Sequence, residues 1–272
     1  MFAVFYARKP LLIVGDEAFD VLYGETRIEG LRLVSSLRIF RPIRRIRVDL
    51  SASKESIARS VLENLPHAYA AIFPARYEEA AKLCSLELKS LVLGLSRGDS
   101  ARDPQLLYAV SDRELDFYRA GRAAALYSSN VILSVAPTRS DMFIESFKRG
   151  FRDSGNENLV FIVSGESGFL DFEDYGCIVI ADFEKNKAYT ELKRVPLILF
   201  TWMSPLFLPK ESVLSFDDSV WAQLNSLHKL LIKGQSGLIP SHAKVFNGRF
   251  RKLYMPALSR KGLYKALNST YK

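Results

Sequence analysis

The stretch VSDRELDFYRAGRAAALYSSNVILSVAP, residues 110–137, decides the fold of this 272-residue chain. It places an alanine-rich helical pattern between two short apolar runs, Leu106–Val110 and Asn130–Val135. Apolar runs of strand length that alternate with helices are typical of a parallel α/β sheet. Ser111 and Glu114 have the spacing of a capping box, which predicts that the helix begins there.

The same alternation continues toward the N-terminus. The sequence predicts further strands at Leu11–Val14, Ile43–Leu50, Ala68–Phe73 and Leu91–Leu95. Arginines alternate along Ile43–Leu50, so this strand is expected at an edge of the sheet. The helix after Ala68–Phe73 carries an apolar stripe that includes Tyr77 and Cys84, which predicts a core position for Cys84.

Toward the C-terminus the pattern predicts four more strands, at Leu159–Val163, Cys177–Ala181, Pro196–Phe200 and Ser212–Phe216. A helix capped by Asp218 is expected to follow, and from Gly234 onward the pattern is irregular. One compact sheet rarely needs so many strands at this length, so two lobes are predicted. We place the first lobe at residues 8–135 plus 204–233 and the second at 136–203 plus 234–272.

Charge is distributed unevenly along the chain. The formal net charge is +8, yet no Asp or Glu follows Asp218, and the last 54 residues contain ten Lys and Arg. A second basic cluster lies between Arg38 and Arg47. Such basic segments either form a solvated surface or contact phosphates or anionic lipid.

Several classes of function lack support in the sequence. Two distant cysteines and three scattered histidines argue against a disulfide framework and a zinc site. No phosphate loop, GxGxxG motif or nucleophile elbow occurs, so we expect no catalytic residues, no metal and no cofactor. No apolar run is long enough to span a membrane. If a leader was removed from the N-terminus, we expect a periplasmic or membrane-anchored protein; otherwise we expect a cytoplasmic one.

Three stretches resemble the type I periplasmic-binding-protein superfamily, closest to basic-membrane-protein nucleoside receptors and lac-repressor-like effector domains. They are GDEAFDVLYGETRIEGLRLV at 15–34, the segment from Val110 to Gly155 that includes DMFIESFKRGFRDSG, and SVLSFDDSVWAQLNSLHKLLIKG at 212–234. The resemblance implies an α/β fold of two Rossmann-like lobes with parallel sheets joined by crossovers. The second lobe is reduced, because only weak helix signal separates Val163 from Cys177.

The resemblance also implies a ligand held by loops at the carboxyl ends of the strands, where open α/β sheets generally bind ligands. Tyr77 lies in one of these loops. The candidate ligand-binding residues are Asp16, Phe19, Arg76, Ser96, Arg139, Asp141, Ser164, Asp182, Trp202 and Asp217. Structural alternatives exist, since Asp16 and Asp217 also suit helix or turn caps, and Phe19 and Trp202 also suit a core.

These features predict a non-enzymatic solute-binding protein that closes two lobes on a small polar ligand, nucleoside- or sugar-like, for transport or sensing. A membrane transporter permease is the expected partner, and nucleic acid is not favoured. Two alternatives remain: a cytoplasmic effector or sensor domain, and a degenerate receptor that binds a protein or an anionic surface. The sequence does not determine the ligand or the oligomeric state.

Overall fold

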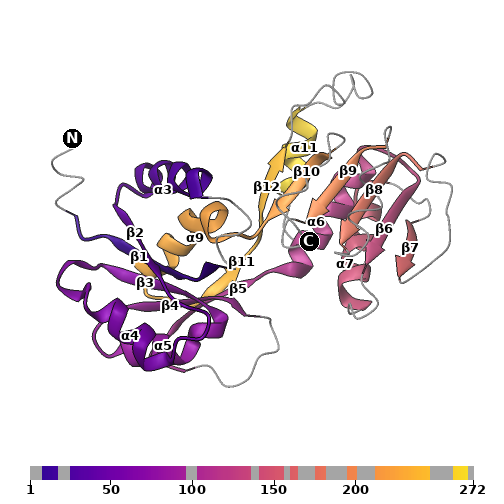
Figure 1. Ribbon diagram of the computed structural model, residues 1–272. Coiled ribbons are helices and arrows are strands. Elements are labelled where there is room, and N and C mark those ends of the chain that lie inside the picture. Colours follow the sequence, from indigo (N-terminus) through magenta and orange to yellow (C-terminus); the bar gives the residue numbers. More distant parts are fainter. Residues whose placement is uncertain are drawn as a thin grey trace. The chain divides into compact units, whose positions relative to one another are not determined.

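The computed structural model describes residues 8–17, 25–95, 103–135, 141–155, 160–164, 175–181, 195–200, 212–245 and 260–268. The chain divides into two compact units (Figure 1). Unit 1 comprises Met1–Ser111 and Ser219–Ile239, and unit 2 comprises Asp112–Asp218 and Pro240–Lys272. None of the described helices is long and apolar enough to cross a membrane.

Unit 1 contains a six-stranded parallel sheet in the order β11-β5-β4-β3-β1-β2. The strands are β1 (Leu11–Gly15), β2 (Ile43–Arg47), β3 (Ala70–Pro74), β4 (Ser90–Leu95), β5 (Leu107–Ser111) and β11 (Gly237–Ile239). The expected edge position of β2 is confirmed. The described part of this unit contains four α-helices: α3 (Glu25–Ile39), α4 (Lys54–Leu62), α5 (Glu78–Ser85) and α9 (Val220–Lys233).

Both faces of this sheet are covered, because alternate side chains of each strand point to opposite faces. Leu12 and Val14 of β1 pack in the core cluster that contains α4 and α5. Leu11 and Ile13 pack in a second cluster with α3 and α9, which contributes Trp221. Figure 1 shows these helix pairs on opposite sides of the strands. Short 3-10 helices η1 (Leu65–His67) and η2 (Ala75–Tyr77) flank β3.

Unit 2 contains a six-stranded sheet in the order β12-β10-β9-β8-β6-β7, parallel except for the β10–β12 pair. The strands are β6 (Val131–Val135), β7 (Val160–Ser164), β8 (Cys177–Ala181), β9 (Leu197–Phe200), β10 (Ser212–Asp217) and β12 (His242–Val245). The described helices are α6 (Arg113–Ala125), α7 (Asp141–Arg152) and α11 (Arg260–Leu267), all of which pack on one face of the sheet.

Helices α6 and α7 cross at two reciprocal glycines. A Cβ atom built on Gly121 would lie 2.1 Å from the carbonyl oxygen of Phe147, and one on Gly150 would lie 2.0 Å from that of Tyr118. These distances are shorter than any van der Waals contact, so the two backbones approach as closely as they do only because both positions lack a side chain.

Several expectations about element boundaries need correction. Helix α6 is capped by Asp112, not Ser111, and the Asp112 carboxylate accepts a 3.3 Å hydrogen bond from the Leu115 amide. Helix α9 is capped by Ser219, not Asp218. The segment after Gly234, expected to be irregular, contains β11, β12 and α11.

The sheets also divide the chain differently from the predicted lobes. Strand β6 was placed in the first lobe, but it pairs with β7 and β8 in the sheet of unit 2. Strand β10 was likewise placed in the first lobe and pairs with β9, and β11 was placed in the second lobe but pairs with β5. The expected missing helix before Cys177 falls on residues 165–174, outside the described residues.

Candidate functional site

The candidate site of unit 1 lies at the carboxyl edge of its sheet, the edge at which the parallel strands end. Asp16 directly follows β1, and Arg76 and Tyr77 belong to η2, which directly follows β3. β1 and β3 are adjacent parallel strands, so residues that follow them are brought to the same place. The pairing of β1 with β3 therefore brings together Asp16 and Arg76, which are 60 residues apart in the sequence.

Asp16 is the centre of this cluster. Its side chain is fully buried, and its Oδ2 atom accepts both an ion-pair contact from the Arg76 guanidinium and a hydrogen bond from the Tyr77 hydroxyl. A buried carboxylate needs such partners, because removing an unpaired charge from water is costly. The two contacts with Asp16 therefore fix the positions of the Arg76 and Tyr77 side chains relative to β1.

The two partners of Asp16 differ in exposure. Arg76 leaves 43% of its side chain exposed, and its guanidinium lies 5.2 Å from the centre of the Tyr77 ring. Tyr77 is buried, and burial together with the hydrogen bond to Asp16 raises the pKa of Tyr77 to about 12. Tyr77 thus remains a neutral hydroxyl at physiological pH, while Arg76 presents a permanent cation to solvent.

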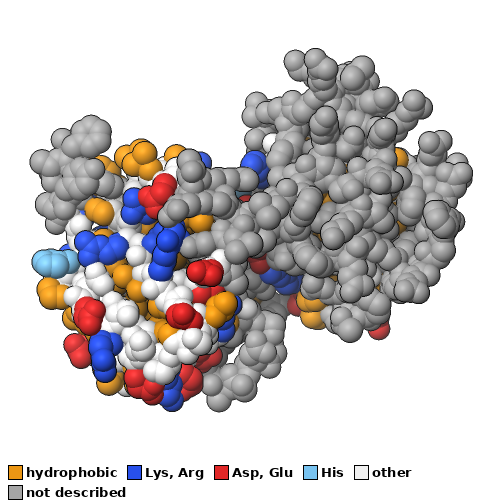
Figure 2. Space-filling view, viewed as in Figure 1, with side chains coloured by type: hydrophobic (Ala, Val, Ile, Leu, Met, Phe, Trp, Pro, Cys, Tyr) orange, Lys and Arg blue, Asp and Glu red, His pale blue; other side chains and the backbone are white. Residues whose placement is uncertain are grey.

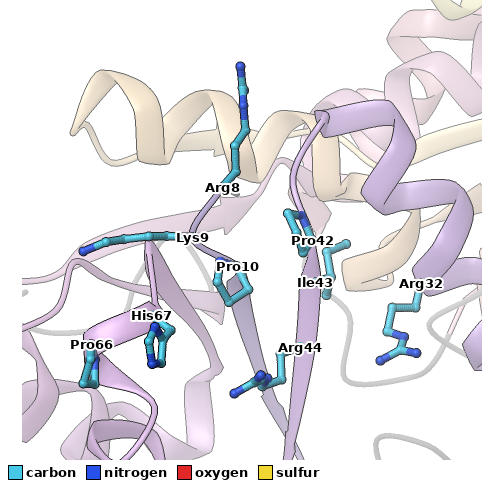
Figure 3. A pocket seen from close by; sticks show the side chains of 9 residues that line it. All are labelled: Arg8, Lys9, Pro10, Arg32, Pro42, Ile43, Arg44, Pro66 and His67. Carbon is cyan, nitrogen blue, oxygen red and sulfur yellow. The ribbon is translucent and has the colours of Figure 1, made fainter. Parts of the chain in front are cut away.

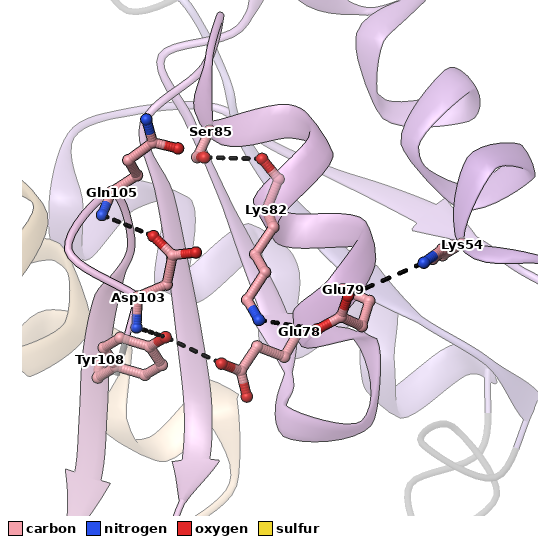
Figure 4. Close-up of polar contacts among 8 residues, drawn as sticks. All are labelled: Lys54, Glu78, Glu79, Lys82, Ser85, Asp103, Gln105 and Tyr108. Atoms are coloured by element: carbon pink, nitrogen blue, oxygen red, sulfur yellow. Dashed lines mark hydrogen bonds and ion pairs between the residues drawn. The ribbon is translucent and has the colours of Figure 1, made fainter. Parts of the chain in front are cut away.

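A second polar cluster near the start of α5 has a structural role (Figure 4). The Tyr108 hydroxyl donates to Glu78 at 2.9 Å and accepts from the Asp103 amide at 2.9 Å. Beside it, Glu79 pairs with Lys82 at 2.8 Å and with Lys54 at 3.9 Å. These groups form hydrogen bonds and ion pairs with one another. We therefore interpret the cluster as part of the packing of α5 and not as a ligand-binding site.

The predicted site residues are placed as follows. The structure brings Asp16 and Arg76 into direct contact. Asp141 begins α7 and is exposed, Ser164 ends β7, and Asp217 ends β10, so all three follow or end strands of unit 2. The other predicted residues lie outside the described residues: Phe19, Ser96, Arg139, Asp182 and Trp202.

Two features of polar chemistry escaped sequence reasoning. Tyr77 was assigned to the apolar stripe of a helix as well as to a loop, and its hydroxyl contact with Asp16 was not predicted. The sequence feature that could have indicated this contact is a side chain with a hydroxyl group shortly after a buried strand. Asp116 was not singled out at all, although it is fully buried in α6 and accepts hydrogen bonds from Ser241, 2.8 Å from the amide and 2.6 Å from the hydroxyl.

Metal chemistry receives no support from the described part of the chain. No group of three or more His, Cys, Asp or Glu side chains there could hold a metal ion. Both cysteines are free and buried, Cys84 in unit 1 and Cys177 in unit 2, and burial raises the pKa of both thiols. The expected core position of Cys84 is confirmed.

Comparison with solved structures identifies the fold. A transcriptional activator of the comK gene from Bacillus halodurans superposes with a TM-score of 0.59 at 11% identity, covering 94% of each chain. An ABC-transporter solute-binding protein from Conexibacter woesei DSM 14684 gives 0.56 at 11% identity, covering 89% of each chain. This chain has the type I periplasmic-binding-protein-like fold.

The fold is also that of a LacI transcriptional regulator from a Rhodococcus species, with a TM-score of 0.52 at 12% identity and coverage of 88% of this chain and 96% of that one. No protein-family model and no curated protein sequence matches the chain. The predicted fold class, α/β with parallel sheets and crossover helices, is confirmed. The three solved structures named here are described as a transcriptional activator, a solute-binding protein and a transcriptional regulator.

Proposed function

We propose that this protein binds a small polar ligand, nucleoside- or sugar-like, without chemical conversion. The observation that carries the proposal is the Asp16–Arg76 pair at the carboxyl edge of unit 1. A fully buried carboxylate that holds a half-exposed guanidinium is a costly arrangement for a surface loop. Such an ion pair is expected where a cation must be held in one position to bind a ligand.

The roles of the three side chains follow from their exposure. Arg76 is the ligand-contacting residue, because its guanidinium has several N–H donors for hydroxyl and carbonyl oxygens. Asp16 is the positioning residue that orients it. Tyr77 supports Asp16 and excludes water from the carboxylate. The described residues Asp141, Ser164 and Asp217 of unit 2 remain separate candidates for ligand contact.

A thermal-unfolding panel tests this function. Nucleosides, sugars, amino acids and organic acids are each added near 1 mM, and we expect one chemical class to raise the melting temperature. A ligand at about 100 times its Kd adds about 2.7 kcal/mol, which corresponds to several degrees for a chain of this size.

Variants make the test specific to the site. Arg76→Gln is expected to abolish the class-selective shift. Arg59→Gln, which removes an exposed arginine from α4 of the same unit, is expected to preserve it. A shift that survives in Arg76→Gln contradicts the assigned site. A flat panel, with native mass spectrometry showing an empty protein, contradicts the function.

The same binding step serves transport or sensing. Because a transcriptional activator and a LacI-type regulator share the fold with a transporter-associated protein, a cytoplasmic effector domain is the second candidate. Cell fractionation of the full-length protein separates the two. Location outside the cytoplasmic membrane, with co-purification of a permease, supports transport, and location in the cytoplasm supports sensing.

A further inference from the structure

Unit 1 has a concave feature at the amino edge of its sheet, the edge where β1, β2 and β3 begin (Figure 3). This pocket has a volume of about 560 Å³. Its lining includes the basic residues Arg8, Lys9, Arg32 and Arg44, together with His67. A pocket of this volume suits a small molecule rather than a protein segment.

The amino-edge pocket is separate from the Asp16–Arg76 site. Pro10 directly precedes β1 and Asp16 directly follows it, so the strand lies between them. A five-residue strand is roughly 17 Å long. A ligand in the pocket therefore cannot contact Arg76, and the two sites are distinct.

The pocket wall is preorganised by prolines. Pro10, Pro42 and Pro66 each come shortly before a strand, and a proline ring restricts its own backbone and lacks an N–H group. Figure 3 shows Lys9, His67 and Arg44 grouped around Pro10, with Arg32 approaching from α3. Rigid backbone holds these donors in place without a ligand, which lowers the entropic cost of binding one.

The charge of the lining is one-sided. Four Lys or Arg residues line the pocket, and no Asp or Glu does. Arg32 pairs with Glu29 at 2.5 Å outside the lining. Within the described residues Lys9 and Arg44 form no ion pair, and the one hydrogen bond of the Arg44 side chain, 2.6 Å long, goes to the neutral Asn64 amide oxygen. That contact orients the guanidinium without neutralising it.

This one-sided charge is not a general property of the unit. Figure 2 shows acidic and basic side chains interspersed over other parts of unit 1 on the face drawn. On α5, for example, Glu79 pairs with Lys82 at 2.8 Å. A basic surface that only kept the protein soluble would carry such pairs, whereas Lys9 and Arg44 of the pocket have none among the described residues.

We propose that the amino-edge pocket binds a phosphate-bearing anion, with Lys9 and Arg44 as its principal ligands. Guanidinium and ammonium groups are the preferred protein donors for phosphate oxygens, and Arg32 and His67 add donors at the rim. The phosphate belongs either to a free small molecule or to a lipid headgroup, since both offer the same chemistry.

Isothermal titration with inorganic triphosphate tests the pocket directly. We expect saturable binding to the full chain at low salt, weakening as ionic strength rises. The double variant Lys9→Gln/Arg44→Gln is expected to lower the affinity at least tenfold. The control Lys54→Gln/Lys82→Gln removes the same charge from the opposite edge of unit 1 and is expected to change it less than twofold.

Co-sedimentation with vesicles distinguishes the two sources of phosphate. Vesicles of phosphatidylglycerol are compared with vesicles of phosphatidylcholine, which has no net charge. Binding to the anionic vesicles that depends on Lys9 and Arg44 assigns a lipid headgroup, and triphosphate binding alone assigns a free anion. Equal loss of affinity in the pocket and control variants, or no saturable binding to either probe, overturns the proposal.

Discussion

At the scale of single residues, Asp116 carries a testable dependence of stability on pH. Burial raises the pKa of Asp116 to about 6, although hydrogen bonds from Ser241 and the nearby Arg113 act in the opposite direction. In the unfolded chain the same carboxyl titrates near 3.8. Between these two values the folded state binds the proton and the unfolded state does not, so this group's contribution to the free energy of unfolding increases as pH falls from 6 to 4.

Asp116→Asn removes this contribution. Its amide oxygen still accepts from the Ser241 amide, and its NH₂ donates to the Ser241 hydroxyl, so the variant is expected to fold. Urea unfolding at pH 7, 6, 5 and 4.5 measures the effect. Relative to the variant, the wild type is expected to gain stability toward low pH, and Ser241→Ala, which keeps the carboxyl, is expected to retain the trend. If the difference in the free energy of unfolding between wild type and Asp116→Asn is the same at every pH, the prediction is wrong.

At this scale the sequence predicted positions better than contacts. Asp16 and Arg76 were both expected at the carboxyl edge, because each directly follows an apolar run of strand length. Their pairing depends on β1 lying beside β3 in register, which no local pattern encodes. The caps at Asp112 and Ser219 were each missed by one residue, since Ser111 and Asp218 are equally good capping types.

At the scale of elements, the crossing of α6 and α7 gives a sharp prediction. Gly121→Ala forces a methyl group against the Phe147 carbonyl, so the helices must separate. We expect a loss of about 3 kcal/mol or more in the free energy of unfolding, measured by urea denaturation. Gly30→Ala in α3 is the matched control, because its new methyl group meets no atom within 4 Å. It is expected to stabilise by up to about 1 kcal/mol. Similar effects of the two substitutions would contradict the close crossing.

The elements that were predicted and those that were missed differ in burial. Strands such as β1 and β8 are buried along their whole length, so their sequences are continuous apolar runs. The missed strands β11 and β12 are three and four residues long, lie at sheet edges and are partly exposed. Their sequences, Gly-Leu-Ile and His-Ala-Lys-Val, therefore carry no strong periodicity.

At the scale of the whole molecule, each unit carries one buried thiol that reports its own unfolding. Cys84 lies in a core cluster of unit 1 and Cys177 in one of unit 2. Pulsed alkylation in increasing urea, read by peptide mass spectrometry, measures the exposure of each thiol. Gly121→Ala is expected to lower the urea concentration at which Cys177 reacts and leave that of Cys84 unchanged. Equal shifts at both thiols would show that the units unfold as one.

The chain passes between the two units three times, after Ser111, Asp218 and Ile239, and this order constrains folding during synthesis. A ribosome delivers β1 to β5 first, but Val220, Trp221 and Leu224 of α9 cover the face formed by Leu11 and Ile13. Helix α3 is already present, but the part of this apolar face that α9 covers stays exposed until about 120 further residues, including most of unit 2, have emerged. Nascent chains stalled between residues 111 and 219 are the species that chaperones should recognise.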